Sequence, residues 1–376
     1  MKKTAPDKDI EKPAADGSAV VVGASLSGLM AGIALAREGL HVTILEKADE
    51  DRPGGAGLQV DGGLFDRSKT ARYLRKIVTD GKKSIKLWST LENRLRTEVQ
   101  SYSTIDLCFN VRVQTVDQDN AAAWAETDEG EVFRADILIG ADGHRSQVRR
   151  HVAPHKPDAT YAGYLVWFAS IKEESMPEGE RPGDGGPSVN MLGGINGGFF
   201  FGSVIGREDG SPGSENRRIG CTFYDNTRND QLRRLGCVQG NVVHHSLAGP
   251  DIPDDTLDKL ADQAYERWPE PWLSATLKAL ETRNLTGIPI KEYVPDNLVK
   301  GRIGLIGDAG HVPAPITASG FNESLQDAAA LSKCVSAGVQ GDAGTKALDK
   351  YESLRLNKVR QMVESGRGFG MSYGRP

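Results

Sequence analysis

The sequence has few of the residues that mark disulfide-rich, metal-binding or nucleic-acid-binding proteins. Only four cysteines occur in 376 residues, and none of them forms a Cys-x-x-Cys pair. The seven histidines are scattered, and the pair His244-His245 has no cysteine or carboxylate at the spacing of a zinc site. The formal net charge of −5 provides no basic face for a nucleic acid. We therefore expect no metal, no nucleic-acid partner and a cytoplasmic location.

Long apolar runs are missing as well. Residues 1–17 are charged and rich in proline and alanine, so we interpret them as a disordered lead-in and not as a signal peptide or anchor. The stretch 18–36 contains Gly28-x-x-x-Gly32, a pattern found in membrane-helix dimers. Three serines and three glycines interrupt this stretch, so we expect no membrane segment.

Glycine, in contrast, is abundant, with 44 residues gathered in short clusters. Such clusters favour a close approach of the backbone to a ligand. The first cluster follows a β-branched run and precedes a helical pattern. The sequence predicts, in order, a strand, a glycine turn, a helix and a second strand: Val20–Val22, Gly23–Gly28, Leu29–Glu38 and His41–Leu45.

This unit is typical of a dinucleotide-binding fold. A parallel strand–helix–strand unit points the helix N-terminus, with its free N–H groups, at a pyrophosphate. Glu46 directly follows the second strand, where a carboxylate hydrogen-bonds a ribose diol. The middle glycine of the usual pattern is Ser25 here, which makes the fit slightly tighter. An ordinary α/β crossover is the alternative, and the motif alone does not separate NAD from FAD.

Two later segments place an aspartate where an apolar run ends. Asp142 lies in DILIGADGHRS, and Asp308 lies in GLIGDAGHVPAP. Small residues at 318–320 and a helical pattern at Asn322–Leu331 follow the second aspartate. If both runs are strands of one open α/β sheet, the aspartates lie at its ligand-binding edge. The alternative for each is an ordinary helix cap.

In this order, the three motifs resemble those of the FAD-dependent aromatic monooxygenases, the flavoprotein hydroxylases. The resemblance covers Ser18 to about Leu356. It implies an α/β protein with a Rossmann-like FAD-binding domain and an inserted antiparallel β-sheet substrate domain, as in p-hydroxybenzoate hydroxylase. We expect the FAD-binding domain at 18–155 and 285–376, a helical part near the flavin at 65–100, and the substrate domain at 156–284.

The resemblance also implies which residues bind FAD. The glycine turn holds the pyrophosphate, and Asp142 lies near the pyrophosphates of FAD and of incoming NAD(P)H. Asp308 binds the ribityl chain, and residues 318–320 present backbone N–H groups to the flavin ring. In the expected helix Leu87–Val99, Trp88 stands where relatives often have a flavin-contacting arginine. The predicted cofactor residues are Gly23, Ser25, Leu26, Ser27, Gly28, Glu46, Lys47, Arg52, Gly57, Gln59, Arg94, Asp142, Gly307, Asp308, Pro315, Ala318, Ser319 and Gly320.

Four segments give a narrower resemblance, to the 2,6-dihydroxypyridine 3-hydroxylase branch. They are YAGYLVWFAS at 161–170, RRIGCTFYDN at 217–226, RWPEPW at 267–272 and GDAGHVPAP at 307–315. Relatives commonly have an arginine where this chain has Phe168, which implies a less charged, more apolar substrate.

The middle of the chain shows strand alternation between 161 and 226, which predicts an antiparallel sheet over the flavin. This period places Phe199 and Phe201 on one face of the sheet and Phe200 on the other. We predict substrate contacts at Phe201, Tyr224 and Pro313. For the aromatic residues, an ordinary core role is the alternative.

The resemblance implies an enzyme in which NADH or NADPH reduces FAD. Oxygen then forms a flavin C4a-hydroperoxide that hydroxylates an electron-rich aromatic or heteroaromatic small molecule. A base would help by deprotonating a ring hydroxyl, and His311 is the candidate, with a structural hydrogen-bonding role as the alternative. Two other functions stay open: a flavin-dependent reductase or oxidase, and a flavin-binding redox sensor without turnover. We expect a monomer or a homodimer.

Overall fold

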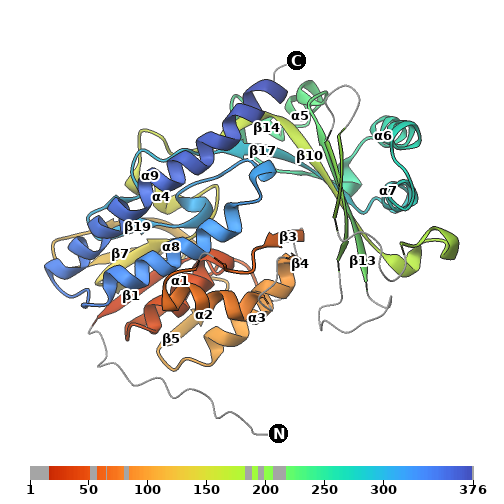
Figure 1. Ribbon diagram of the computed structural model, residues 1–376. Coiled ribbons are helices and arrows are strands. Elements are labelled where there is room, and N and C mark those ends of the chain that lie inside the picture. The colour runs from red at the N-terminus through yellow and green to blue at the C-terminus, as the bar shows by residue number, and fades with distance from the viewer. Residues whose placement is uncertain are drawn as a thin grey trace, which may run out of the picture.

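The computed structural model describes residues 17–50, 57–64, 66–79, 84–182, 189–193, 199–205 and 217–374. Within them are two six-stranded sheets, one mostly parallel and one antiparallel. Figure 1 shows β1 and β19 of the first sheet in one part of the molecule and β10, β13 and β17 of the second sheet in the other. The predicted lead-in, apart from Gly17, and the predicted cofactor residue Arg52 lie outside the described residues.

The first sheet has the order β18-β19-β9-β1-β2-β5 and is parallel except for the edge pair β18–β19. Its strands are β1 (Ser18–Val22), β2 (His41–Leu45), β5 (Ile105–Cys108), β9 (Ile137–Gly140), β18 (Val299–Lys300) and β19 (Ile303–Leu305). Successive side chains of β1 enter different cores. Val21 packs against helices, whereas Val20 and Val22 pack against a small three-stranded sheet on the other face. The result is a three-layer α/β domain.

The helical layer consists of five helices of very different length. They are α1 (Leu26–Ala36), α2 (Lys69–Val78), α3 (Trp88–Gln100), α8 (Gly320–Val335) and α9 (Asp342–Tyr373). The opposite layer is a meander of β6 (Val113–Gln118), β7 (Ala123–Thr127) and β8 (Val132–Ala135). An antiparallel pair of β3 (Gly57–Val60) and β4 (Ser84–Leu87), which flank α2 in the chain, and the short helix α4 (Gln147–Val152) complete this part of the chain.

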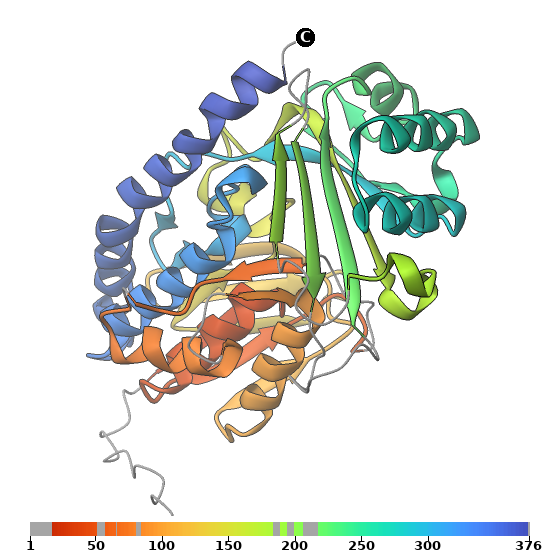
Figure 2. The same cartoon turned by 45° about the vertical axis from the view of Figure 1, so that its right-hand side comes forward.

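The second sheet has the order β11-β12-β13-β10-β17-β16. Its strands are β10 (Thr160–Lys172), β11 (Val189–Gly193), β12 (Phe199–Ile205), β13 (Arg218–Asp225), β16 (Leu247–Ala248) and β17 (Leu285–Glu292). Figure 2 shows the green strands of this sheet upright beside the teal helices α6 (Asp254–Arg267) and α7 (Trp272–Glu281). Helix α5 (Asn229–Arg234) and the pair β14 (Val238–Gln239) and β15 (Val242–Val243) lie between β13 and β16 in the chain.

The alternation predicted for the second sheet is confirmed. Phe200 joins the core beneath α6 and α7, with its ring 4.7 Å from that of Trp268. Phe199 and Phe201 pack instead against Tyr224 on the other face. One face of the sheet therefore packs in a hydrophobic core, and the other face is available to line a cavity.

One predicted domain boundary is wrong. Residues 285–292 were assigned to the FAD-binding domain, but they form β17, which pairs with β10 over most of its length. The segment LTGIPIKE holds a glycine and a proline inside the strand, and both weaken the strand signal in the sequence. Its pairing partner lies more than a hundred residues earlier, so no local pattern reports it. The second sheet therefore ends at Glu292.

Candidate active site

A cavity of about 960 Å³ lies between the two sheets. On one side its lining comes from segments that directly follow β1, β2, β9 and β19, which is the ligand-binding edge of an open parallel sheet. On the other side its lining comes from the free face of the second sheet and from the loop before α8. We call these the first-sheet end and the second-sheet end of the cavity.

The glycine turn at the first-sheet end leaves no room for a side chain at either of its two glycines. Gly23 has φ of +102°, and a Cβ there would lie 2.5 Å from the Ala141 carbonyl oxygen. A Cβ on Gly28 would lie 1.8 Å from the Gly23 carbonyl oxygen. Ser25, which replaces the usual middle glycine, has extended backbone at φ of −82° and lines the cavity. The replacement is therefore free of backbone strain.

Glu46 joins the glycine turn to the end of β2. Its carboxylate accepts hydrogen bonds from the backbone N–H groups of Ala24, at 2.8 Å, and Ala48, at 2.9 Å. The side chain is buried among protein atoms but still lines the cavity. This places a fixed carboxylate beside the turn, where the sequence predicted a ribose contact.

Asp142 caps the N-terminus of α4, which is the alternative role that the sequence allowed for it. Its carboxylate accepts hydrogen bonds from the Ser146 hydroxyl and from the backbone N–H groups of Gln147 and Val148, which begin α4. Burial raises the pKa of this carboxyl, and these hydrogen bonds oppose the increase. Asp142 also lines the cavity, next to Gly143 and Arg145. Capping and a place at the ligand edge therefore coexist in one residue.

Asp308 differs from the other two carboxylates of this edge. It lines the cavity, and within the described part of the chain its carboxylate receives no hydrogen bond. Desolvation by the surrounding protein raises its pKa, while Lys291, Arg149 and the neighbouring His311 oppose that increase. A carboxylate that faces a cavity without protein donors suits a ligand that carries hydroxyl groups.

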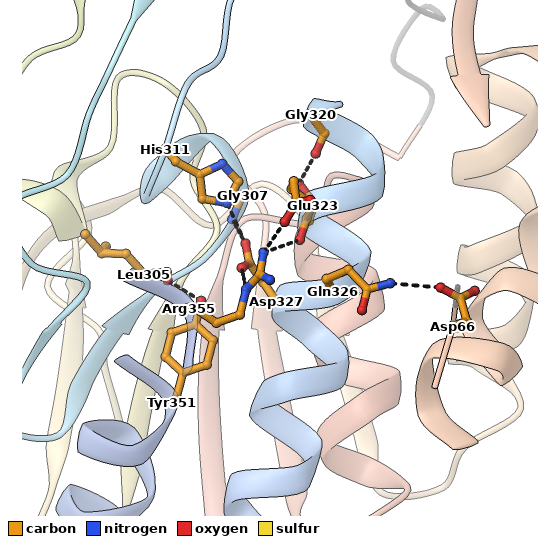
Figure 3. A network of polar contacts seen from close by, with 11 residues as sticks. Asp66, Leu305, Gly307, His311, Gly320, Glu323, Gln326, Asp327, Tyr351 and Arg355 are labelled. Atoms are coloured by element: carbon orange, nitrogen blue, oxygen red, sulfur yellow. Dashed lines mark hydrogen bonds and ion pairs between the residues drawn. The ribbon is translucent and has the colours of Figure 1, made fainter. Parts of the chain in front are cut away.

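A buried ionic network holds the turn that carries Asp308, as Figure 3 shows. Asp327 on α8 accepts a hydrogen bond from the Gly307 backbone N–H at 3.0 Å and pairs with His311 Nε2 at 2.6 Å. It also pairs with Arg355 Nε of α9 at 2.7 Å. Burial alone would raise the pKa of Asp327, but Arg355, His311 and the hydrogen bonds outweigh it and lower the pKa to about 2.

The ring of His311 is fully buried and is not part of the cavity lining. Its Nε2 is committed to Asp327. This geometry favours the structural alternative for His311 and argues against a base that touches a substrate.

The loop before α8 closes the cavity from one side. Pro315 begins a short 3₁₀ turn that ends at Ala318, whose φ is +49°. The hydroxyl groups of Thr317 and Ser319 lie 2.6 Å apart, and α8 begins at Gly320. The N-terminus of α8 is therefore at the cavity, where its dipole favours negative charge.

The second-sheet end is a floor of pleated strands. Strand register places Phe168 of β10, Thr222 of β13 and Phe201 of β12 in one row across the sheet. Tyr224 and Ser203 lie in the rows on either side. All five line the cavity. Two phenyl rings and three hydroxyl groups thus form this floor.

Comparison with known families supports both ends. An FAD binding domain model matches residues 237–366, and an NAD(P)-binding Rossmann-like domain model matches residues 21–78. The chain is 25% identical over 385 residues to an FAD-dependent urate hydroxylase of Klebsiella pneumoniae, covering 93% of this chain and 88% of the relative. It is also 25% identical over 393 residues to a 3-hydroxybenzoate 6-hydroxylase of Klebsiella oxytoca, covering 94% and 88%. The chain is an FAD-dependent aromatic monooxygenase.

The fold of this monooxygenase is that of the family. The solved structure of 2,6-dihydroxypyridine-3-hydroxylase from Arthrobacter nicotinovorans aligns with a TM-score of 0.71 and 19% identity, covering 96% of this chain and 93% of that one. The predicted architecture of a Rossmann-like domain with an antiparallel sheet domain is confirmed, and so is FAD as the cofactor.

Most residues predicted to bind FAD lie at the cavity of the monooxygenase. Gly28, Gly307 and Arg94 do not line it; Gly28 ends the glycine turn, Gly307 begins the Asp308 turn, and both glycines are packed against protein atoms. The three predicted substrate residues, Phe201, Tyr224 and Pro313, all line it.

Sequence reasoning missed two groups of residues. One is the lining contributed by the meander, at Val111–Gln114 and Asp128. The other joins α2 to α8: Arg75 pairs with Asp66 at 2.9 Å and donates to the Asn322 side chain at 2.5 Å. Arg75 and Asp66 are buried, so their charges are satisfied by each other and by α8. This contact fixes the first turn of α8 at the cavity.

Among the described helices of the monooxygenase, none combines the length and apolarity needed to cross a bilayer. In the same part of the chain, no cluster of three or more histidine, cysteine or acidic side chains is arranged to hold a metal ion.

Proposed function

We propose that this monooxygenase holds FAD along the first-sheet end of the cavity and hydroxylates an electron-rich aromatic or heteroaromatic ring at the second-sheet end, with NADH or NADPH and O₂. The observation that carries the proposal is the continuity of the two ends. One cavity runs from a turn whose two glycines admit no side chain to a floor lined by Phe168, Phe201 and Tyr224. A planar ring on that floor lies against the loop before α8.

The residues at the first-sheet end fit FAD. The glycine turn and the N-terminus of α1 would hold the pyrophosphate, and Glu46 would accept hydrogen bonds from a ribose. Asp308 would accept a hydrogen bond from the ribityl chain, which explains a cavity-facing carboxylate without protein donors. The N-terminus of α8 would face the flavin ring and favour negative charge there.

The bound cofactor, once reduced, supplies activated oxygen, and the protein supplies orientation and a dry site. Pro313 and Ile316 line the cavity on the loop before α8, and the aromatic floor lines it on the second sheet. Both groups are mostly apolar, so a ring between them is shielded from water. His311 acts in this proposal as a positioning residue, because it holds the Gly307-Asp308 turn through Asp327.

The test begins with the visible spectrum of the purified protein and continues with NADH and NADPH oxidation, with and without 2,6-dihydroxypyridine. A flavin spectrum, substrate-stimulated oxygen uptake and ¹⁸O from ¹⁸O₂ in the product would support hydroxylation. Substrate turnover without oxygen incorporation would favour the reductase or oxidase alternative. A protein that binds flavin but whose NADH or NADPH oxidation is not stimulated by any aromatic compound would favour the redox sensor. A protein that does not bind FAD would overturn the proposal.

Two finer expectations accompany this function. The free thiols of all four cysteines support a reducing, cytoplasmic location. A monomer or a homodimer is our expectation for the assembly, and light scattering of the FAD-loaded protein would decide between them.

A further inference from the structure

We infer that the substrate of this monooxygenase is an uncharged aromatic molecule and that the cavity selects against rings bearing a carboxylate. The inference rests on the proposed hydroxylase function of the same cavity. It concerns the second-sheet end, where the floor and the loop before α8 enclose the space for a ring.

None of the charged residues among the described cavity lining belongs to the floor or to the loop 312–316 before α8. They follow strands of the first sheet or belong to the meander: Glu46, Lys47, Arg112, Asp128, Asp142, Arg145 and Asp308. Two of them, Arg112 and Asp128, already form an exposed ion pair. The charged half of the cavity is therefore the half that the cofactor occupies in the proposed function.

The floor is uncharged in each row that reaches the cavity. The central row is Phe168, Thr222 and Phe201, and the rows beside it contribute Tyr224 and Ser203. These side chains belong to one face of the sheet, because Phe201 and Ser203 on β12, and Thr222 and Tyr224 on β13, are two positions apart; Gly202, between the first two, lines the cavity without a side chain. The loop opposite contributes only Val312, Pro313, Ala314, Pro315 and Ile316 before the backbone turn at Ala318.

Arg218, a cation of β13 on this face of the sheet, is committed to another contact. Arg218 lies opposite Lys172, one facing row beyond Ser170, Gly220 and Ser203. Its guanidinium donates to the Ser170 hydroxyl at 2.8 Å and to the Ser170 carbonyl at 2.7 Å. It does not line the cavity. Among the described residues of the floor none is a cation, so a carboxylate bound there would lose water without gaining a cation from them, which disfavours its binding.

The hydroxyl groups of the floor suit neutral polar substituents. Tyr224 is 5% exposed, and burial raises the pKa of its phenol, so the group stays neutral and both donates and accepts. Thr222 and Ser203 offer the same chemistry. A ring hydroxyl or keto group finds partners here, and a full negative charge does not.

The experiment uses the FAD-loaded protein at neutral pH and a pair of probes that differ in charge. Methyl 3-hydroxybenzoate and 3-hydroxybenzoate share one ring, and their binding is followed by the change in the visible spectrum of bound FAD. We expect the ester to bind at least about tenfold more tightly than the acid. Equal or tighter binding of the acid would overturn the inference, and so would a failure of the ester to bind.

Phe168→Arg tests the cause. A guanidinium in the central row should reverse the preference toward 3-hydroxybenzoate, because it gives the carboxylate a bidentate partner. Phe168→Leu is the matched control and should keep the preference for the ester. If Phe168→Arg does not retain FAD, Phe201→Arg places the cation in the same row from β12. A cation that leaves the preference unchanged in both variants would contradict the inference.

These outcomes are separable from failure of the proposed function. A protein without FAD, or one whose FAD is not reduced by NADH or NADPH, would contradict the hydroxylase proposal before any probe is added. If the protein binds FAD, is reduced and prefers the acid, the hydroxylase proposal stands and only the inference about substrate charge is contradicted.

Discussion

The two ends of the cavity are built from different parts of the chain. At the first-sheet end, backbone geometry and fixed carboxylates form the site: Gly23 and Gly28 exclude side chains, and Glu46 is bonded to the turn. At the second-sheet end, side chains standing on a pleated surface form the site, among them the rings of Phe168 and Phe201.

The difference has a consequence for how each end tolerates change. At the two glycines of the turn, neighbouring atoms leave no space for a larger residue, so substitution there is not tolerated. The shape of this end, and with it the ligand that it binds, is therefore fixed. A row of side chains on a rigid sheet accepts many substitutions without disturbing the strands. The first-sheet end therefore suits an invariant cofactor, and the second-sheet end suits a substrate that differs between relatives.

Gly28→Ala should have the largest effect at the first-sheet end. The added Cβ would lie 1.8 Å from the Gly23 carbonyl oxygen, so the turn must open. We expect purified protein almost without FAD, measured as the ratio of flavin to protein absorbance after gel filtration. Gly368→Ala is the control, since it is also a helical glycine and no atom lies within 4 Å of the added Cβ. Full flavin content in Gly28→Ala would contradict the close packing of the turn.

Asp327→Asn should destabilise the protein by about 3–5 kcal/mol. The change leaves Arg355 and His311 buried beside a neutral amide and weakens the support of the Asp308 turn. The measurement is the apparent free energy of unfolding in urea, with Asp349→Asn, an exposed position on α9, as the control. A loss no greater than that of the control would show that the network contributes little.

The same pair of proteins has a defined pH dependence. The folded pKa of Asp327 is about 2, below the ordinary value of 3.8. A carboxylate with a lowered folded pKa contributes its stabilisation above the unfolded pKa and loses it as pH falls toward the folded pKa. The stability difference between wild type and Asp327→Asn should therefore shrink by about 2 kcal/mol between pH of roughly 4 and 2. A difference that stays constant over this range would assign the effect to packing alone.

The sequence predicted the first-sheet end well because local patterns encode it. The glycine turn, Glu46 and the Asp308 turn each follow an apolar strand directly, so their place at the sheet edge follows from the fold class. The second strand was placed at the residues of β2, and α1 begins only three positions before the predicted helix. Short-range chemistry was sufficient in each of these cases.

Contacts between residues that are far apart in the sequence could not be predicted from such local patterns. Arg75 and Asn322 are 247 positions apart, and neither belongs to a pattern that names the other. The direction of the His311 ring was equally hidden, because its partner Asp327 lies on the buried face of α8. A buried aspartate and a buried arginine in two amphipathic helices were the available signal, and only packing shows that they meet.

Asp308→Ala separates the two ends more finely than the changes above. The variant removes one charge-assisted hydrogen bond to the cofactor in our proposal and leaves the floor intact. We expect FAD affinity to fall by about 2 kcal/mol, roughly 30-fold, measured by fluorescence titration of the apoprotein. Asp258→Ala, an exposed position on α6, should change nothing. An unchanged FAD affinity in Asp308→Ala would contradict the proposed contact between the ribityl chain and this carboxylate.

Tyr224→Phe is the matching change at the other end, and its effect should be the smallest. The ring keeps its stacking on Tyr164, whose centroid is 5.8 Å away, and only the hydroxyl is lost. We expect methyl 3-hydroxybenzoate to bind about 1 kcal/mol more weakly while FAD affinity stays unchanged. A fall in FAD affinity would mean that the floor also shapes the cofactor site. With Asp308→Ala affecting only FAD and Tyr224→Phe affecting only the ring, the two ends act as independent sites that share one cavity.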